Sequence, residues 1–226
     1  MSPAGLVAAV ALMAAAPKGG GLEVTYLSGT AELSAPGAKG WTELEKGASV
    51  PLGATVRTGE KSRLELVAKD GSVLRLAESS KLELTQATFG GKARKVGVRL
   101  WLGRMWAHVT KAVGGDSSFE VRTENAIAGV RGTSFAVLAQ QDLSALVRVY
   151  AGTVGVRGAK GASRGARKEV PGPSRISRAQ WEEVIAAAMT EVKVTALGDI
   201  RPAESFEDEG DALEWAQWNQ ARDTPH

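Results

Sequence analysis

The chain has 226 residues, of which 43% are hydrophobic and 23% are charged, so it can form one globular domain, alone or with tails. Its 28 lysines and arginines nearly balance 25 aspartates and glutamates, and the net charge of +3 gives no argument for a nucleic-acid partner. Without cysteine there is no disulfide, thiolate nucleophile or cysteine zinc site. His108 and His226 are the only histidines. We therefore predict a non-enzymatic protein with no catalytic residue, no metal site and no cofactor.

An uncharged apolar run, AGLVAAVALMAAA, occupies Ala4–Ala16 and precedes Pro17, Lys18 and three glycines. Its length fits the hydrophobic segment of a secretory signal and is short for a membrane-spanning helix. Its final three alanines resemble a cleavage site, although no Lys or Arg precedes the run. We expect residues 1–21 to be a signal peptide with a linker, and the mature protein to be periplasmic or secreted, with no stable membrane span. The alternative is an alanine-rich helix of a cytoplasmic protein.

Strand-like alternation of apolar and charged residues begins near Thr30. The units SRLEL (Ser62–Leu66), SVLRL (Ser72–Leu76) and SKLEL (Ser80–Leu84) each place two leucines on one face of a strand and charged residues on the other. Between the first two units, the Asp70-Gly71 pair predicts a hairpin with a type I′ turn.

A longer-range similarity joins VRLWLGRMWAHV (Val98–Val109) to VRVYAGTVGVRG (Val147–Gly158). Both segments read Val-Arg-aliphatic-aromatic-x-Gly and then resume alternation. Short strands at this spacing, separated by glycine-containing turns, are typical of sandwiches, barrels and β-solenoids. We predict an all-β domain over residues 22–158, sandwich-like or solenoid-like.

The stretch FEVRTENAIAGVRGTSFAV, Phe119–Val137, has alternating strands at both ends and small residues with two glycines between them. We interpret the middle as a structural corner in which glycine provides positive φ or close packing, and Arg131 as a structural clamp. The corner residues are Thr123, Ala126, Gly129, Val130, Arg131, Gly132 and Thr133.

This stretch resembles the recurrent Thr-x-x-Ala and AGVRGT elements of the FecR domain family. The resemblance extends from about Thr25 to Gly158: GTAELSAPG (Gly29–Gly37) is similar to the family's opening strand and turn, and VRVYAGTVGV to its closing strand. It implies an extracytoplasmic binding or scaffolding module of the cell envelope, like the periplasmic sensory domain of FecR-type regulators. Because at most 24 residues precede the β region, we expect the cytoplasmic anti-sigma region to be missing and sigma-factor control to be unsupported. The expected partner is another envelope protein or a cell-wall polymer.

A carbohydrate- or peptidoglycan-binding module is the alternative function. It requires Trp41 and either Trp101 or Trp106 to cluster on the surface as a stacking platform. Trp101 and Trp106 are an odd number of residues apart, so they face opposite sides of a strand unless Gly103 forms a bulge. His108 lacks a second ligand at metal spacing, and we interpret it as structural.

After the β region the composition becomes basic and then acidic. We expect residues 159–176 to be a basic flexible linker, and residues 177–226 to be helical and acidic. The first expected helix runs from Arg178 to about Glu191 and covers an end of the β domain; the second runs from Asp211 to about Ala221. In the acidic tail, Trp215 and Trp218 are candidate anchors for another protein, the alternative being a tail that folds back on the basic segment.

Overall fold

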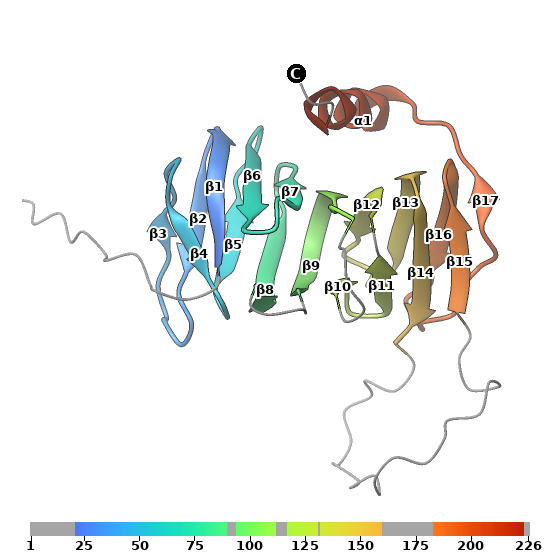
Figure 1. The fold of residues 1–226 in the computed structure, drawn as a ribbon, viewed down its shortest axis with the longest axis horizontal. Coiled ribbons are helices and arrows are strands. Elements are labelled where there is room, and N and C mark those ends of the chain that lie inside the picture. The colour runs from blue at the N-terminus through green and yellow to red at the C-terminus, as the bar shows by residue number, and fades with distance from the viewer. Residues whose placement is uncertain (1–20, 90–93, 112–116, 131, 160–182, 224–226) are drawn as a thin grey trace, which may run out of the picture.

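The structure is a computed structural model that describes residues 21–89, 94–111, 117–130, 132–159 and 183–223. These residues form a β structure with a helix lying across one face (Figure 1). The expected signal peptide lies almost entirely outside the described residues, as do Arg131 and nearly all of the expected basic linker. The described elements, in chain order, are β1 (Gly21–Ser28), β2 (Ala31–Ser34), β3 (Thr42–Glu43), β4 (Ser49–Pro51), β5 (Thr55–Thr58), β6 (Arg63–Ala68), β7 (Val73–Leu76), β8 (Lys81–Thr88), β9 (Lys95–His108), β10 (Ser118–Arg122), β11 (Ala126–Val130), β12 (Ser134–Ala139), β13 (Ala145–Ala151), β14 (Thr153–Gly158), β15 (Glu183–Ala187), β16 (Thr190–Val194), β17 (Glu204–Ser205) and α1 (Gly210–Asp223).

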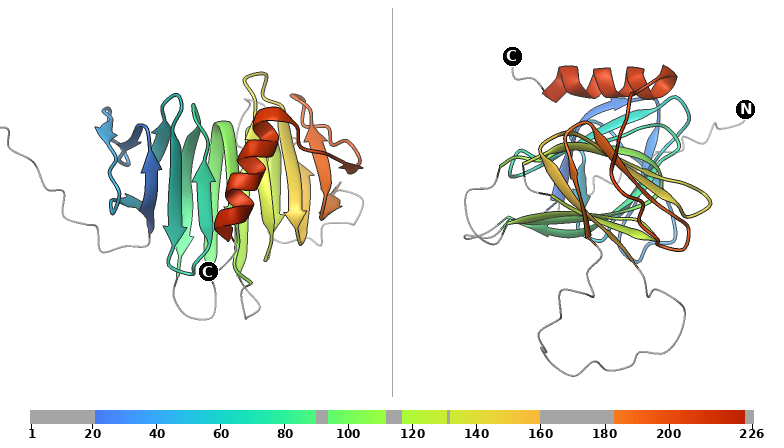
Figure 2. Two further views of the ribbon diagram at one scale, coloured as in Figure 1. Left: turned by 90° about the horizontal axis from the view of Figure 1, so that it is seen from above. Right: turned by 90° about the vertical axis from the view of Figure 1, so that its right-hand side faces the viewer.

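The strands form two layers that share β9 (Figure 2). Sheet A has the order β4, β1, β6, β7, β9, β12, β13, β16, β17. Sheet B has the order β3, β2, β5, β8, β9, β10, β11, β14, β15. Among the described strands every pairing is antiparallel except that of β9 with β10. The all-β prediction with a C-terminal helix is confirmed.

The core lies between the two layers and follows the predicted alternation. Leu64, Leu66, Leu74 and Leu76 of sheet A are buried, and so are the SKLEL leucines of sheet B, Leu82 and Leu84. Burial of a leucine side chain contributes about 2 kcal/mol, so these repeated pairs supply much of the force that holds the layers together.

The two similar segments found in the sequence are the places where the chain changes layer. β9 pairs within sheet B up to Leu102 and within sheet A from Gly103 onward. Correspondingly, β13 of sheet A ends at Ala151 and β14 of sheet B begins at Thr153, with Gly152 between them. Gly103 has φ +93° and Gly152 has φ +85°, a backbone region that side chains disfavour. The shared glycine is therefore the residue that allows the strand to turn from one layer into the other.

The predicted hairpin between β6 and β7 is present, but its turn is not of type I′. A type I′ turn needs positive φ at two residues, and here Gly71 has φ +82° whereas Asp70 is not in that region. The Gly71 amide donates to the Ala68 carbonyl at 2.9 Å, and the Ser72 amide donates to the Asp70 carboxylate at 3.0 Å. The connection is thus a turn with one left-handed glycine, a common geometry of slightly longer hairpin loops.

The helix expected from Arg178 to about Glu191 is wrong wherever the structure describes it. Residues 183–187 form β15 on the edge of sheet B, and residues 190–194 form β16 next to β13 in sheet A. Without β15 and β16, one edge each of β13 and β14 would have unpaired backbone groups. The backbone hydrogen bonds that the two added strands form there outweigh the local helix propensity of their residues. The two layers therefore continue beyond the expected end of the β domain at residue 158.

Replacing Gly103 with alanine tests the layer change. A Cβ atom at Gly103 would lie 2.6 Å from the Ser80 Cα, and alanine would be forced to keep φ near +93°. We expect Gly103→Ala to lower the free energy of unfolding by about 3 kcal/mol in urea denaturation. Gly129→Ala is the matched control because a Cβ atom added at Gly129 would meet no atom within 4 Å, and it should change stability by less than about 0.5 kcal/mol. Equal effects of the two substitutions would contradict this role of Gly103.

Candidate functional site

The outer face of sheet A carries one row of side chains in register across six strands. Its members are Glu65, Arg75, Trp106, Ala136, Arg148 and Glu191. Helix α1 lies over this face, where Trp215 and Ala216 pack against Trp106 and Ala136 in a second apolar cluster. Trp106 has 0% exposed surface as a result. The face that strand alternation assigns to solvent is therefore a second, partly polar core.

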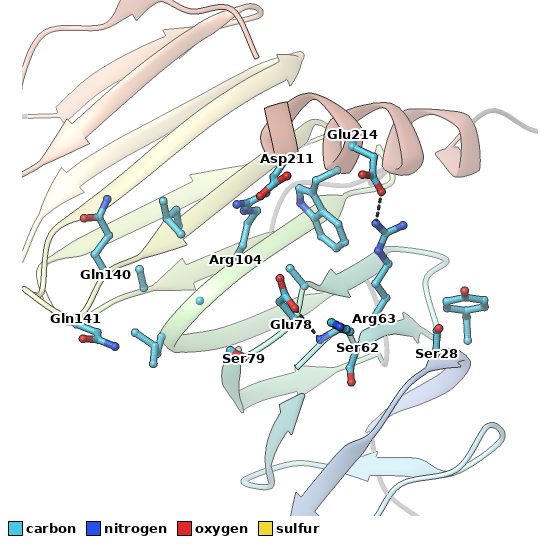
Figure 3. A pocket seen from close by; sticks show the side chains of 18 residues that line it. Ser28, Ser62, Arg63, Glu78, Ser79, Arg104, Gln140, Gln141, Asp211 and Glu214 are labelled. Atoms are coloured by element: carbon cyan, nitrogen blue, oxygen red, sulfur yellow. Dashed lines mark hydrogen bonds and ion pairs between the residues drawn. The ribbon is translucent and has the colours of Figure 1, made fainter. Parts of the chain in front are cut away.

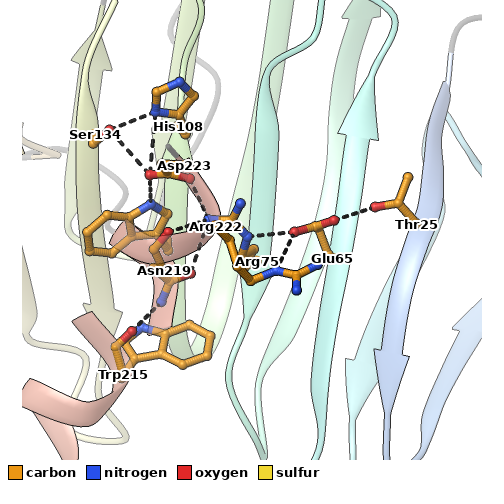
Figure 4. Close-up of polar contacts among 10 residues, drawn as sticks. Thr25, Glu65, Arg75, His108, Ser134, Trp215, Asn219, Arg222 and Asp223 are labelled. Atoms are coloured by element: carbon orange, nitrogen blue, oxygen red, sulfur yellow. Dashed lines mark hydrogen bonds and ion pairs between the residues drawn. The ribbon is translucent and has the colours of Figure 1, made fainter. Parts of the chain in front are cut away.

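Arg75 is the charged group at the centre of this second core, with 2% of its side chain exposed. Its Nε donates to Glu65 Oε2 at 2.7 Å, and its guanidinium also donates to Asp223 Oδ1 at 2.6 Å (Figure 4). A third contact runs to the Asn219 carbonyl at 3.2 Å. A buried guanidinium needs such partners, since desolvation of an unpaired charge costs several kcal/mol. Two of the three partners are supplied by α1, so the helix and the buried arginine depend on each other.

The carboxylate of Asp223 ties the last turn of α1 to two more strands. Its Oδ2 accepts a hydrogen bond from the Trp106 indole nitrogen at 2.8 Å and one from Ser134 Oγ at 3.4 Å. His108 Nδ1 lies 2.8 Å from Ser134 Oγ and 3.4 Å from the same carboxylate. The single histidine of the described residues thus takes part in a helix-docking contact.

The electrostatics of this cluster favour ionised carboxylates. Burial acts to raise the pKa of Glu65, but hydrogen bonds from Arg75, Thr25 and Arg222 outweigh it and hold the pKa below its ordinary value. At the other end of the row, burial likewise opposes ionisation of Glu191, and Lys193 and Arg148 lower its pKa. Both carboxylates therefore stabilise the fold in their charged form.

A smaller polar cluster holds the segment before α1. Arg148 donates to Glu191 at 2.8 Å and to Asp208 at 2.7 Å, and the Tyr150 hydroxyl donates to Asp208 at 3.1 Å. Burial, followed by the charge of Asp208, raises the pKa of Tyr150 well above its ordinary value, so the phenol stays protonated as a donor. The charges in this cluster satisfy one another.

A groove of about 790 Å³ lies beside the N-terminal half of α1, at the end of sheet A where β7 stops (Figure 3). Hydroxyl, amide and charged side chains line it, among them Ser28, Ser62, Glu78, Gln140 and Gln141. Arg63 and Glu214 bridge its rim at 2.8 Å. Its volume falls within the range of ligand-binding clefts.

A second cavity of about 170 Å³ adjoins the groove under the first turns of α1. Arg104, Leu138 and Trp215 line both spaces. The Trp215 indole nitrogen is buried without a hydrogen-bond acceptor. The Arg104 side chain is half-buried, and it forms no ion pair or side-chain hydrogen bond with a described residue. The junction of the cavities therefore holds one buried donor without an acceptor, Trp215 Nε1, and one half-buried cation, Arg104.

The tryptophans considered as a stacking platform separate into two environments. Trp106 is covered by α1, whereas Trp101 is 42% exposed on the outer face of sheet B. Trp41 is half-buried. Lys81 lies between it and Trp101, with its Nζ 5.9 Å from the centroid of each ring. Arg57 lies 4.1 Å from the Trp41 ring, and Arg99 lies 3.7 Å from that of Trp101. Cations therefore occupy one face of each ring.

The AGVRGT element is only in part a corner. Ala126–Val130 form strand β11, so the corner interpretation is wrong for Ala126, Gly129 and Val130. The chain turns after this strand, where Gly132 has φ +66° and where a Cβ would lie 2.6 Å from Lys111 Cγ. Thr123 precedes the strand, and its Oγ1 accepts a hydrogen bond from the Ala126 amide at 3.0 Å. Thr133 is buried at the turn.

The acidic tail packs on its own chain. Trp215 and Trp218 stack with ring centroids 5.4 Å apart, and Trp218 also contacts Tyr26 of β1. Trp215 is only 5% exposed, so in this arrangement it is not available as an anchor for another protein. The tail folds back on sheet A, a surface that neither sequence interpretation considered.

Sequence reasoning did not find Arg75, Glu65, Asp223 or Arg104. Alternation placed the first two on a solvent face, and no local pattern shows that a helix near the C-terminus covers them. The sequence held only an indirect indication of this helix contact. Tryptophans and acidic residues recur at helical spacing in the tail, and they are complementary to the arginines on the strand faces.

Among the residues that the structure describes, no three histidine, aspartate or glutamate side chains gather in a way that could hold a metal ion. Within the same residues, no helix combines the length and the apolar character needed to cross a membrane.

Comparison with known proteins supplies family context. Residues 54–155 match the family model FecR, described as FecR protein. Two solved structures of a "putative anti-sigma factor" from Parabacteroides distasonis resemble this chain in fold, each with a TM-score of 0.51 and 21% identity. The similarity covers 74% of this chain and 64% of that chain, so it spans less than two thirds of the relative. No curated protein matches the sequence.

Removing the charge of Arg75 tests its role under α1. We expect Arg75→Met to lower the free energy of unfolding by about 3 to 5 kcal/mol, because Glu65 and Asp223 would remain buried without their partner. Arg122→Met is the control: Arg122 is exposed on sheet B, far from α1, and loss of its ion pair with Glu120 should cost less than about 1 kcal/mol. Urea denaturation measures both. Similar small losses would contradict a central role for Arg75.

Acid should weaken the same cluster. Since the folded-state pKa of Glu65 lies below its ordinary value of 4.5, its contribution to stability is complete above about pH 4.5 and is lost as pH falls through the folded-state pKa. The stability difference between wild type and Glu65→Gln should therefore be constant above about pH 5 and shrink toward pH 3. Glu214→Gln provides an exposed comparison. A difference that stays constant down to pH 3 would contradict the assignment.

Proposed function

This chain contains a FecR domain, and from that premise we propose that it is an exported, non-enzymatic binding module of the bacterial cell envelope. Its role resembles that of the periplasmic sensory domain of FecR-type regulators, with another envelope protein as partner. The apolar run at Ala4–Ala16 supports export, because it has the length of a signal-peptide core.

The groove beside α1 is the single observation that carries the binding proposal. It is about 790 Å³ in volume and is lined by side chains that donate and accept hydrogen bonds. Its floor belongs to the rigid sheet and one wall belongs to the helix, so a partner would contact both. A site of mixed polarity at the boundary of two elements suits recognition of an extended polypeptide.

Site-specific photocrosslinking in a Gram-negative host tests location and site together. The full chain carries a photoreactive phenylalanine analogue either at Gln141, in the groove, or at Thr85, on the exposed outer side of sheet B. We expect the protein in the periplasmic fraction, shortened near Ala16, with protein adducts from Gln141 and none from Thr85. Full-length protein in the cytosol would overturn export, and adducts from Thr85 alone would overturn the site.

Binding of a cell-wall polymer is the second candidate, favoured by the nearness of Trp41 and Trp101 to Lys81 on one face of sheet B. Sedimentation with purified peptidoglycan distinguishes it from the first. Under the leading proposal neither wild type nor Trp101→Ala sediments with the polymer. Sedimentation of wild type that is lost in Trp101→Ala would favour the second candidate, because Trp101 provides the more exposed stacking surface.

A further inference from the structure

We propose that the junction of the two cavities under α1 is a binding site for a carboxylate on an extended polypeptide, held by Arg104 and the indole N–H of Trp215. This inference rests on the proposed function and names the chemistry of the partner group at the same groove. The ligand carboxylate is either an acidic side chain or a free C-terminus.

Arg104 stands apart from the other arginines on the outer face of sheet A. Arg63, Arg75 and Arg148 each form an ion pair with a carboxylate of their own chain. Arg104 forms none with any described residue, although it is half-buried. Its neighbour in β12 is Leu138, and on its other side β7 has ended, so no acidic residue stands opposite it in the sheet. An unpaired, partly desolvated guanidinium attracts a carboxylate, which it can bind through two parallel hydrogen bonds.

Trp215 supplies the second, independent observation. Its side chain lines both cavities and the residue is 5% exposed, with its indole N–H lacking any acceptor in the described structure. A buried donor without an acceptor is unfavourable, and an incoming carboxylate oxygen would satisfy it. The walls of the smaller cavity are otherwise apolar or self-satisfied: Asp208 is engaged by Arg148 and Tyr150. Arg104 and Trp215 are thus the groups with unused donors there.

The first turns of α1 form one wall of the site. Asp211 and Ala212 line the two cavities, so the positive end of the helix dipole lies at the junction. In Figure 3 the Asp211 side chain points toward Arg104, although no hydrogen bond or ion pair joins the two, so an incoming carboxylate would compete with Asp211 for the guanidinium. The last turns are fixed to the sheet through Asn219, Arg222 and Asp223, and the N-terminal half is held by the burial of Trp215 and Ala216 against sheet A.

The size of the spaces fits this class of ligand. A cavity of about 170 Å³ accommodates a carboxylate with a short stem, and the adjoining groove of about 790 Å³ accommodates the flanking backbone. Gln140, Gln141 and Ser79 offer amide and hydroxyl partners for peptide groups along that groove.

The test titrates full-length protein with three pentapeptides built on glycine. One is capped at both ends and has a central aspartate, one is capped in the same way and has a central asparagine, and one has only a free C-terminal carboxylate. The readout is the ¹⁵N-labelled indole resonance of Trp215, assigned by its disappearance in Trp215→Phe. We expect a saturable shift with at least one carboxylate peptide and none with the asparagine peptide; the two carboxylate peptides distinguish a side chain from a C-terminus.

Variants separate binding from folding. Arg104→Gln should weaken binding about tenfold to a hundredfold, with unchanged melting because its side chain makes no internal bond. Arg122→Gln, an exposed arginine on sheet B, is the control and should leave affinity unchanged. Trp215→Phe, followed by calorimetry below its own melting temperature, should weaken binding about threefold to tenfold, and it should also lower the melting temperature because part of a buried ring is removed. If Arg104→Gln is poorly folded, Arg104→Lys, which keeps the charge but not the planar fork, should show intermediate affinity.

Equal shifts with the aspartate and asparagine peptides would overturn the proposal, as would no shift with any peptide or an Arg104→Gln protein with wild-type affinity. These outcomes leave the proposed function separately testable, because export and crosslinking at Gln141 do not depend on a carboxylate.

Discussion

The burial of Arg75 is the constraint on which the outer half of the structure depends. A guanidinium on a sheet face is normally exposed, and it can be removed from water only when anionic and carbonyl partners arrive with the element that covers it. Glu65 lies beside it in the sheet, and Asp223 and Asn219 arrive with α1. The helix therefore does not merely add apolar contact. It completes a charge cluster, and that requirement sets where α1 lies and which of its ends is fixed.

Placement of α1 in turn creates the candidate site. Because the last turn is fixed over β7 and β9, the first turns extend over the place where β7 ends and leave a groove beside the sheet. The inner core sets the other boundary: β9 changes layer at Gly103, next to Arg104, so the groove floor is the point where two sheets diverge. The positions of Trp215 and Arg104 beside the cavity thus follow from one glycine, Gly103, and one buried arginine, Arg75.

The inner β structure could be predicted from the sequence, whereas its outer covering could not. Alternating leucines in SRLEL, SVLRL and SKLEL report burial directly, since strand side chains alternate strictly between two faces. The same rule assigns Glu65 and Arg75 to water, because it takes no account of a distant helix. The strand β15 was mistaken for a helix for a related reason: pairing with the free edge of β14 decides its conformation, and that edge is a tertiary feature. Arg104 could not be singled out from the sequence, because what distinguishes it is that no described carboxylate forms an ion pair with it, and only the three-dimensional structure shows this.

Hydrogen exchange of the α1 amides measures whether Arg75 couples α1 to sheet A. We expect slow exchange in the last turns of α1 in the wild-type protein and faster exchange in its first turns. In Arg75→Met we expect loss of protection throughout α1 while the inner strands β6 and β9 remain protected. Free-peptide exchange rates for α1 in the wild-type protein, or α1 protection that survives Arg75→Met unchanged, would contradict this coupling.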